Sequence, residues 1–148
     1  MTSSITQQSL LQGYLIEQTA KQMKQGFAKE LSNLNLDITV DQWIILDTLS
    51  DQDHLSQLQI ALATQKDAPT ITRILDLLEK KSVLTRKSDK TDRRKFVISL
   101  TANGKKIIQK IKPISLSYRN NCYYGISQKD MTTLKNILET ISTNLKNK

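Results

Sequence analysis

The chain has 148 residues, 38% of them hydrophobic, so it is long enough for one domain with a buried core and needs no stabilising metal or disulfide. Its single cysteine, Cys122, excludes an intrachain disulfide and favours a reducing compartment. The N-terminal segment lacks the basic start and apolar run of a signal peptide, and no apolar run approaches the roughly 20 residues that span a bilayer. We therefore expect a cytoplasmic protein with no membrane partner.

The positive charge is concentrated in the middle of the chain. Residues 1–66 carry 4 lysines against 7 acidic residues, whereas residues 67–112 carry 9 lysines and 4 arginines against 5 acidic residues. The whole chain has a formal net charge of +8. A localised basic segment is typical of a protein that binds a polyanion, although a charge that only maintains solubility is the alternative.

The first part of the chain predicts two helices. Apolar residues recur at helical spacing over residues 7–35 and indicate one long helix. Thr39 is the expected N-cap of a second helix from about residue 40 to 49, with Gln42 completing a capping box. Trp43, the only tryptophan, is interpreted as a core anchor of that second helix. Its expected apolar stripe consists of Val40, Trp43, Ile44 and Leu49.

Two short helices joined by a tight turn follow. Ser56 can cap a helix that runs to about residue 64, and Asp67 can cap the next, with Pro69 in its first turn where a missing N–H costs nothing. The first is expected to bury Leu58, Ile60, Ala61 and Thr64, and the second to bury Ile71, Ile74, Leu75 and Leu78. The opposite face of the second helix carries Pro69, Arg73, Asp76 and Lys80, with Thr70 and Thr72 on its flanks. This is the helix-turn-helix pattern, which by itself is common in helical domains.

A β-hairpin with a basic tip is predicted directly after this pair. Residues 83–87 and 96–100 are β-prone, and Phe96, Ile98 and Leu100 alternate with polar or smaller residues. Between them lies the segment SDKTDRRK, in which acidic and basic residues are crowded together. Charges that are merely solvated are the alternative interpretation, but the position after a helix-turn-helix favours a wing that contacts DNA.

The C-terminal part predicts two further helices. Thr101 can cap a helix that runs to about residue 124, and Pro113 inside it is expected to kink or break it. Ser127 can cap a last helix, with Asp130 at the capping-box position. That helix has a heptad-like apolar seam, and apolar helices at both chain ends suggest a separate helical layer, most simply a dimer interface. The seam consists of Met131, Leu134, Leu138, Ile141 and Leu145.

These segments resemble the MarR/SlyA family of bacterial transcriptional regulators. The stretch SQLQIALATQKDAPTITRILDLLEKK is similar to the helix-turn-helix of the family, and TDRRKFVISLTANG is similar to its wing and the entry to the following helix. The resemblance implies a mainly α (α+β) fold in a single domain, residues 1–148. A winged helix-turn-helix lobe would cover residues 38–100, and a helical dimerisation region would cover residues 1–36 and 101–148.

The sequence departs from the usual family pattern in three places, which involve four residues. Ser82 stands where a glycine normally follows the second helix, so we expect that helix to terminate differently. Gln65 and Lys66 stand where a glycine and an apolar residue are common, so we expect a nonstandard turn. Leu77 stands where many members carry a polar or basic residue.

The resemblance implies a homodimeric repressor that reads a pseudo-palindromic double-stranded DNA site, with half-sites about 10 bp apart. Arg73 and the neighbouring threonines would meet base edges, and Arg94 would enter a narrow A·T-rich minor groove while Asp92 braces the loop. The remaining cations would contact phosphates, and so would Ser56 at its helix start. The predicted DNA-binding residues are Ser56, Pro69, Thr70, Thr72, Arg73, Asp76, Arg86, Lys87, Lys90, Asp92, Arg93 and Arg94.

Family members often bind a small aromatic or lipophilic effector, and Tyr14, Trp43 and Tyr118 are candidates to line such a site. Aromatic residues at helical spacing are also ordinary core residues. The sequence has one histidine, His54, and one cysteine, and it shows neither a Gly-rich phosphate loop nor a carboxylate cluster. This composition favours neither an enzyme nor a protein with a metal or other cofactor. Two alternatives remain open: a helical module that binds an acidic protein through the basic wing, and a non-specific DNA-binding protein.

Overall fold

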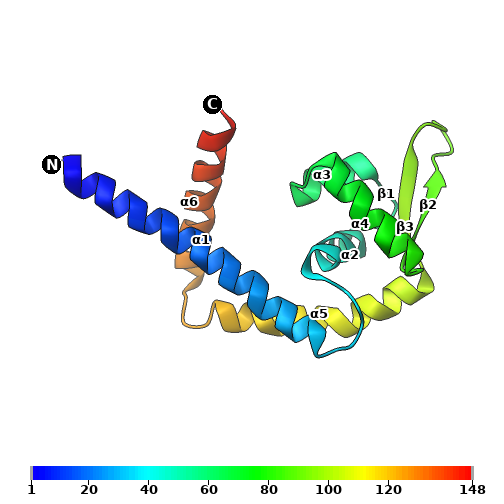
Figure 1. The fold of residues 1–148 in the computed structure, drawn as a ribbon, viewed down its shortest axis with the longest axis horizontal. Coiled ribbons are helices and arrows are strands. Elements are labelled where there is room, and N and C mark those ends of the chain that lie inside the picture. The colour runs from blue at the N-terminus through cyan, green and yellow to red at the C-terminus, as the bar shows by residue number, and fades with distance from the viewer. Residues whose placement is uncertain (1, 148) are drawn as a thin grey trace. The chain divides into compact units, whose positions relative to one another are not determined.

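The computed structural model describes residues 2–147 and the side chains of residues 7–147. Met1 and Lys148, the outermost residues of the predicted dimerisation region, lie outside the described residues. The chain divides into two compact units, and the boundary between them falls after Leu116. Figure 1 labels the helices and strands along the chain. Among the described helices, none is long and apolar enough to cross a membrane.

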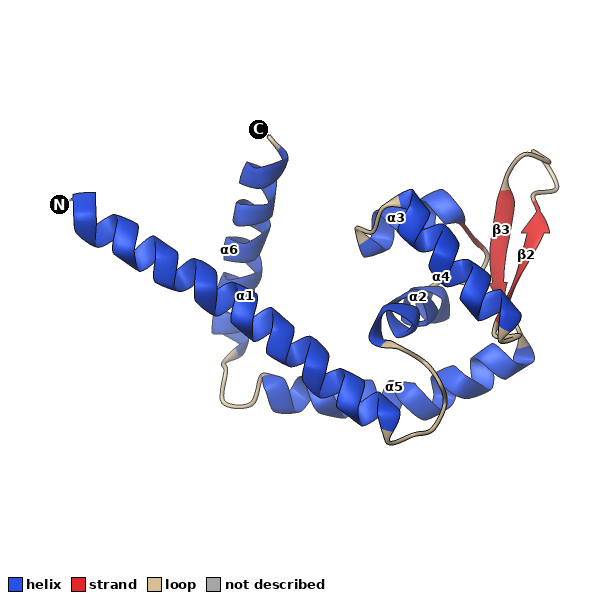
Figure 2. Ribbon diagram, viewed as in Figure 1, coloured by secondary structure: helices blue, strands red, loops and turns tan. Residues whose placement is uncertain are grey.

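The fold is mainly helical with one small sheet, as the sequence predicts (Figure 2). A β-hairpin follows directly on two consecutive short helices, which confirms the predicted helix-turn-helix and wing. The elements in chain order are α1 (Thr2–Ser32), α2 (Val40–Asp51), β1 (Leu55–Ser56), α3 (Gln57–Thr64), α4 (Ala68–Lys80), β2 (Leu84–Ser88), β3 (Phe96–Leu100), α5 (Ala102–Cys122) and α6 (Gln128–Lys146).

The three strands form an antiparallel sheet in the order β1-β3-β2. In the hairpin, Leu84 pairs with Leu100 at the base and Ser88 pairs with Phe96 near the tip. The short strand β1 pairs with the other side of β3, with Ser56 opposite Val97. Because Ser56 is also the N-cap of α3, the sheet fixes where α3 begins relative to the hairpin.

The core of the first unit lies between α2, α3, α4, the sheet and the start of α5. The predicted stripe of α4 is confirmed, since all four of its residues are buried. The predicted stripe of α2 is wrong in part, because Ile45 and Leu46 are fully buried while Ile44 is only half-buried. The cause is that α2 contacts α1, α3, α4 and β3, so it is covered on several sides and a single stripe does not describe it.

The prediction for α3 is wrong at Leu58, whose side chain is 68% exposed. This helix has only two turns and buries one residue completely, Ile60. Leu58 and Leu62 are four residues apart, so they lie on one face, and that face is exposed.

Helix α4 ends as a glycine-capped helix does, although Ser82 occupies the glycine position. Ser82 adopts a left-handed conformation with φ of 57°. Its N–H donates to Glu79 O at 2.9 Å, and the N–H of Val83 donates to Leu78 O at 3.0 Å, which is the hydrogen-bond pattern of a Schellman motif. Gln65 is likewise left-handed at the end of α3, with φ of 55°. The expectation that α4 terminates differently is therefore wrong, and the backbone is strained at both Ser82 and Gln65 because each is a non-glycine residue in the left-handed conformation.

Pro113 does not end its helix, since α5 is continuous from Ala102 to Cys122. A proline removes one backbone hydrogen bond, and the exposed side of α5 accommodates the ring at this position. At the start of α6, Ser127 is the predicted N-cap, but Asp130 accepts a hydrogen bond from the Ser127 hydroxyl at 2.9 Å rather than completing a capping box through the backbone.

Both terminal helices present apolar side chains to solvent within their own units. On α1 the exposed apolar residues span the first half of the helix, and on α6 they include most of the predicted seam. They are Leu10, Leu11, Tyr14, Leu15 and Ile16 on α1, and Leu134, Ile137, Leu138, Ile141 and Leu145 on α6.

Candidate nucleic-acid interface

The exposed face of α4 is the first part of the candidate interface. Asp67 caps the helix by accepting a hydrogen bond from the Thr70 N–H at 2.8 Å, and its hydrogen bonds to Thr70 hold the pKa of its carboxyl below the ordinary value. Pro69 follows in the first turn, as predicted. Both Pro69 and Arg73 are exposed and lie four residues apart on the same face. A helix with this face uncovered can enter a DNA major groove.

Thr72 is tied to the preceding helix. Its hydroxyl accepts a hydrogen bond from the Gln57 side-chain amide and donates to Ala68 O at 3.0 Å. With the hydroxyl occupied, the methyl group is the part of Thr72 that remains for a thymine contact. Gln57 was not predicted as an interface residue. Its place directly after the Ser56 cap is the signal that could have identified it.

Ser56 has a structural role at the start of α3. Its hydroxyl oxygen accepts the Gln59 N–H at 3.1 Å, and its own N–H donates to Gln59 Oε1 at 2.8 Å, which forms a complete capping box. The hydroxyl proton is not used in these two bonds, so it remains available as a donor. This geometry is compatible with the predicted phosphate contact.

The wing is braced from within by two aspartates. Asp89 accepts hydrogen bonds from the backbone N–H and the hydroxyl of Thr91, both at 2.8 Å. Asp92 accepts hydrogen bonds from the backbone N–H and Nε of Arg94. The backbone hydrogen bonds lower the pKa of both aspartates, so the bracing groups are ionised at neutral pH.

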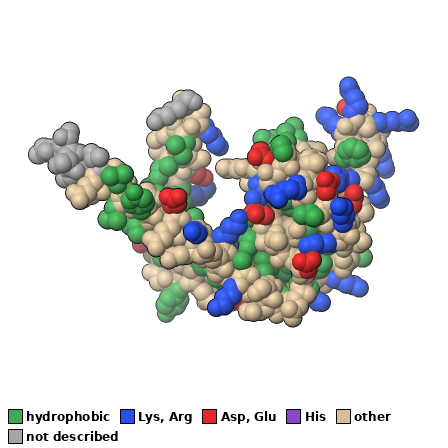
Figure 3. Space-filling view, in the orientation of Figure 1, with side chains coloured by type: hydrophobic (Ala, Val, Ile, Leu, Met, Phe, Trp, Pro, Cys, Tyr) green, Lys and Arg blue, Asp and Glu red, His purple; other side chains and the backbone are tan. Residues whose placement is uncertain are grey.

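Basic side chains project from this braced loop. In Figure 3 lysine and arginine side chains surround the tip of the hairpin. Arg94 is 92% exposed at its side chain. The other exposed cations of the hairpin are Lys87, Lys90, Arg93 and Lys95.

Arg86 differs from the other wing cations, because only 19% of its side chain is exposed. Its guanidinium forms an ion pair with Asp76 of α4, and its Nε lies 3.6 Å from Glu79 Oε2. The hydrogen bond that the guanidinium donates to Asp76 is the main cause of a raised pKa at Arg86. The structure therefore brings together Asp76 and Arg86, two predicted DNA-binding residues, as partners of each other.

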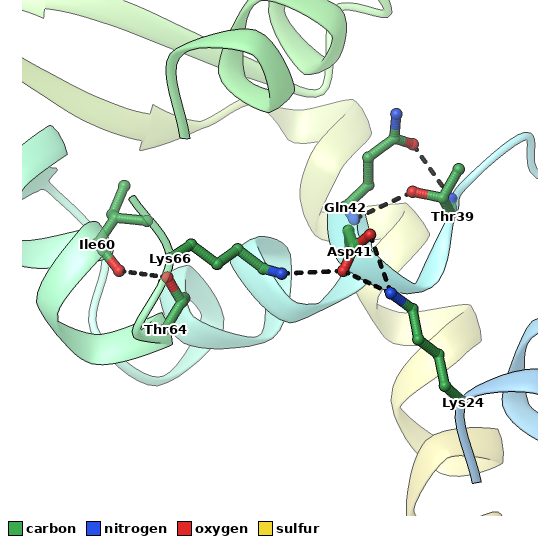
Figure 4. A network of polar contacts seen from close by, with 7 residues as sticks. All are labelled: Lys24, Thr39, Asp41, Gln42, Ile60, Thr64 and Lys66. Carbon is green, nitrogen blue, oxygen red and sulfur yellow. Dashed lines mark hydrogen bonds and ion pairs between the residues drawn. The ribbon is translucent and has the colours of Figure 1, made fainter. Parts of the chain in front are cut away.

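A second network of ion pairs connects α1, α2 and the turn of the helix-turn-helix (Figure 4). Lys66, in the turn between α3 and α4, places Nζ 2.9 Å from Asp41 Oδ1, and Lys24 of α1 lies 3.2 Å from the same carboxylate. Burial opposes ionisation of Asp41, but the hydrogen bonds from Lys66 and Lys24 outweigh it and lower the pKa. A lysine can thus occupy a position where an apolar residue is usual, because Asp41 compensates its charge.

The predicted effector-binding aromatics lie in different environments. Trp43 is 1% exposed in the core, its Nε1 has no hydrogen-bond partner, and Tyr14 is 66% exposed on α1. Tyr118 is half-buried on α5 in the second unit. A groove of about 750 Å³ lies between the end of α1 and the start of α2, and neither Tyr14 nor Trp43 lines it. Its apolar lining includes Leu31, Leu36, Ile38 and Val40.

The described residues contain no group of three or more His, Cys, Asp or Glu side chains that could hold a metal ion. What they do contain is a helix-turn-helix with an uncovered second helix beside a braced basic hairpin. This combination defines the winged helix-turn-helix class of DNA-binding folds.

Comparison with known proteins identifies the family. The model of the MarR family matches residues 38–96, which span the helix-turn-helix and most of the wing. Transcriptional regulator PA3341 is 30% identical in sequence, with a TM-score of 0.78, and the alignment covers 92% of this chain and 98% of that one. The chain therefore belongs to the MarR family of DNA-binding transcriptional regulators, as its sequence predicts.

Two further solved structures are similar over most of the chain. The MepR–DNA complex of S. aureus is 29% identical, with a TM-score of 0.81, and the alignment covers 89% of this chain and 96% of MepR. BpsR of Bordetella bronchiseptica, whose DNA binding is regulated by 6-hydroxynicotinic acid, is 22% identical, with a TM-score of 0.76. The alignment with BpsR covers 88% of this chain and 97% of BpsR, and at this identity it supports the fold alone.

Proposed function

We propose that this protein is a sequence-specific transcriptional repressor that binds a pseudo-palindromic operator in double-stranded DNA as a homodimer. The observation that carries the proposal is the exposed face of α4 beside the braced, basic β2–β3 wing. The crystal structure of MepR, a relative at 29% identity, was determined as a complex with DNA, which supports DNA as the partner.

The residues have distinct roles in this proposal. Arg73 reads a guanine edge, and the side chains of Thr70 and Thr72 lie against neighbouring bases. Arg94 enters the minor groove, where a narrow A·T-rich segment has the most negative potential. The hydroxyl of Ser56 and the side chains of Lys87, Lys90 and Arg93 contact phosphates, so that affinity falls steeply with salt concentration.

Dimerisation is supported by the apolar side chains that α1 and α6 each leave exposed. Soluble monomers rarely expose contiguous apolar surface of this kind, and a two-fold symmetric partner would cover it. A homodimer would present two copies of α4 to successive major grooves on one side of the duplex, about 10 bp apart.

Regulation by a small aromatic or lipophilic effector is also part of the proposal. The groove of about 750 Å³ between α1 and α2 has a volume typical of small-molecule sites, which supports this part of the proposal. Because Trp43 is 1% exposed, an effector would meet it only if the core opened, so the groove is the better-placed site.

The direct test selects duplexes from a random pool with the full-length protein and measures binding of the enriched sequence and of a scrambled duplex by gel shift. We expect an inverted repeat, a strong preference over the scrambled duplex and a linear fall of log affinity with log salt. Equal affinity for both duplexes would instead identify a non-specific DNA-binding protein. No binding to either duplex would leave the helical protein-interaction module as the function.

A further inference from the structure

Arg86 connects the two elements that would read DNA. It lies on β2, ten residues after Asp76, and its side chain extends from the wing to α4. Its Nη2 donates to Asp76 Oδ1, and its Nε lies 3.6 Å from Glu79 Oε2. The backbone N–H of Arg86 also donates to Glu79 Oε2, at 3.0 Å. Two carboxylates of α4 therefore bind both the side chain and the backbone of one residue in the wing.

The position of β2 in the sheet explains the backbone contact. Because the strand order is β1-β3-β2, β2 has a partner on one side only, and its other edge is unpaired within the sheet. Glu79 accepts a hydrogen bond along that open edge, where a strand would otherwise leave its N–H to water. The contact fixes β2 against the last two turns of α4 rather than leaving the wing held only at its base.

Charge and exposure separate Arg86 from the cations that can meet a phosphate. Its side chain is 19% exposed, whereas that of Arg94 is 92% exposed. The positive charge of Arg86 is compensated by two carboxylates within its own unit. With 19% of its side chain exposed and its charge compensated by Asp76 and Glu79, Arg86 is less accessible to a phosphate than the exposed wing cations are.

We propose that Arg86 is a positioning residue that locks the wing to the recognition helix through Asp76 and Glu79, and that it does not itself contact DNA. Asp76 lies three residues after Arg73, on the same exposed part of α4, so the lock holds the wing close to the turn that carries the base-reading arginine. With the lock in place, the distance between the major-groove contact of Arg73 and the minor-groove contact of Arg94 is fixed. In each half-site the protein then recognises the guanine that Arg73 contacts, the A·T-rich minor groove that Arg94 enters, and the distance between the two. This inference rests on the proposed DNA-binding function.

Replacement of Asp76 distinguishes a lock from a phosphate ligand, because the two roles of Arg86 predict opposite changes in DNA affinity. If Arg86 is a lock, Asp76→Asn releases the wing and acts like Arg86→Gln. If Arg86 is a phosphate ligand that Asp76 merely neutralises, Asp76→Asn frees the guanidinium and tightens binding, while Arg86→Gln reduces the salt dependence by about one phosphate contact. Lys110→Gln, which removes one exposed positive charge from α5, is the control for net charge.

The readout is the penalty for a shift in spacing. The probe is the duplex that the wild-type protein selects from a random pool, compared with a derivative that has one base pair inserted between the core of each half-site and its A·T-rich flank. We expect the wild-type protein and Lys110→Gln to lose affinity on insertion. In Arg86→Gln and Asp76→Asn we expect the affinity lost on insertion to be smaller by about 5-fold or more, which is the lower end of the coupling measured between linked sites. The double variant should show the same insertion penalty as the single variants, because both changes break the same lock.

An unchanged insertion penalty in both single variants, or tighter binding by Asp76→Asn, would overturn the proposal. A wild-type protein that selects no sequence would refute the proposed function itself. The lock would then be judged without DNA, by a double-mutant cycle on the free energy of unfolding: coupling between Arg86 and Asp76 is expected, and additive effects would show that no lock exists.

Discussion

Asp92 accepts two hydrogen bonds from Arg94, one from its backbone N–H at 3.1 Å and one from its Nε at 3.2 Å. The guanidinium is thereby directed while its side chain stays 92% exposed. A side chain that is already oriented loses less conformational entropy when it binds, so the wing is preorganised for its groove contact.

The first prediction concerns these two residues separately. Arg94→Ala should weaken binding to an A·T-flanked operator by about 1–3 kcal/mol, because the cation is lost from the groove. Asp92→Ala should cost less, because it removes only the orientation of Arg94. Gel-shift titrations with A·T and G·C flanks provide the comparison, and a loss in Arg94→Ala that is the same for both flanks would place this arginine on a phosphate.

The second prediction concerns the base-reading face of α4. Arg73→Ala should cost about 1–3 kcal/mol on the selected operator and relax the preference for its guanine position. Lys105→Gln, at an exposed position on α5, controls for the loss of one positive charge. Repeating the selection with the variant provides the check. An unchanged consensus would remove Arg73 from the base contacts.

The third prediction uses the left-handed residue after α4. Ser82→Gly should stabilise the protein by about 0.5–1 kcal/mol, because relief of roughly 1–2 kcal/mol of backbone strain exceeds the extra entropy of the unfolded chain. Lys80→Gly, inside the last turn of the same helix, should instead destabilise by about 1 kcal/mol. Urea unfolding of both variants tests the contrast. Destabilisation by both would mean that Ser82 contributes a contact that outweighs the strain.

The fourth prediction concerns Asp41 and pH. Folding lowers the pKa of the Asp41 carboxyl from its ordinary value of 3.8, so the ionised carboxylate stabilises the fold. This stabilisation is fully present above pH 3.8 and is lost as the pH falls through the lowered pKa. Asp41→Asn should therefore reduce the free energy of unfolding near pH 7, by roughly 1 kcal/mol or less because the carboxylate is partly exposed to solvent.

Urea unfolding at several pH values checks the Asp41 prediction. The difference from the wild-type protein should shrink as the pH falls below 3.8 and through the lowered pKa of Asp41. Asp51→Asn breaks a more exposed ion pair with Lys112 and should change stability less. A difference that persists undiminished at pH 3 would contradict an electrostatic origin.

Local patterns in the sequence were sufficient for the elements of the interface. The stripe of α4, the capping box at Thr39, the N-cap at Ser56 and the hairpin each depend on residues a few positions apart, and the structure confirms them. Such signals lie within one helix or one hairpin, where periodicity and capping chemistry decide the conformation.

Contacts between different helices and strands could not be predicted from such local patterns. The burial of Ile45 and Leu46 depends on neighbours that cover α2 from several sides, and the exposure of Leu58 depends on the absence of such a neighbour on its face of α3. The partners of Arg86 and Lys66 are 10 and 25 residues away in sequence, and nothing in the spacing of charges identifies them. The assignment of individual residues to DNA contacts therefore stays a prediction.

The exposed apolar seam of α6 predicts that the stability of the protein depends on its concentration, because association follows mass action. If folded chains associate through this face while unfolded chains do not, dilution shifts the equilibrium toward unfolding. The thermal midpoint should then rise with total protein concentration. Leu138→Lys, at a seam position that is 41% exposed, should lower the midpoint and remove its dependence on concentration. A midpoint independent of concentration in the wild-type protein would show that stability and association are separate properties of this chain.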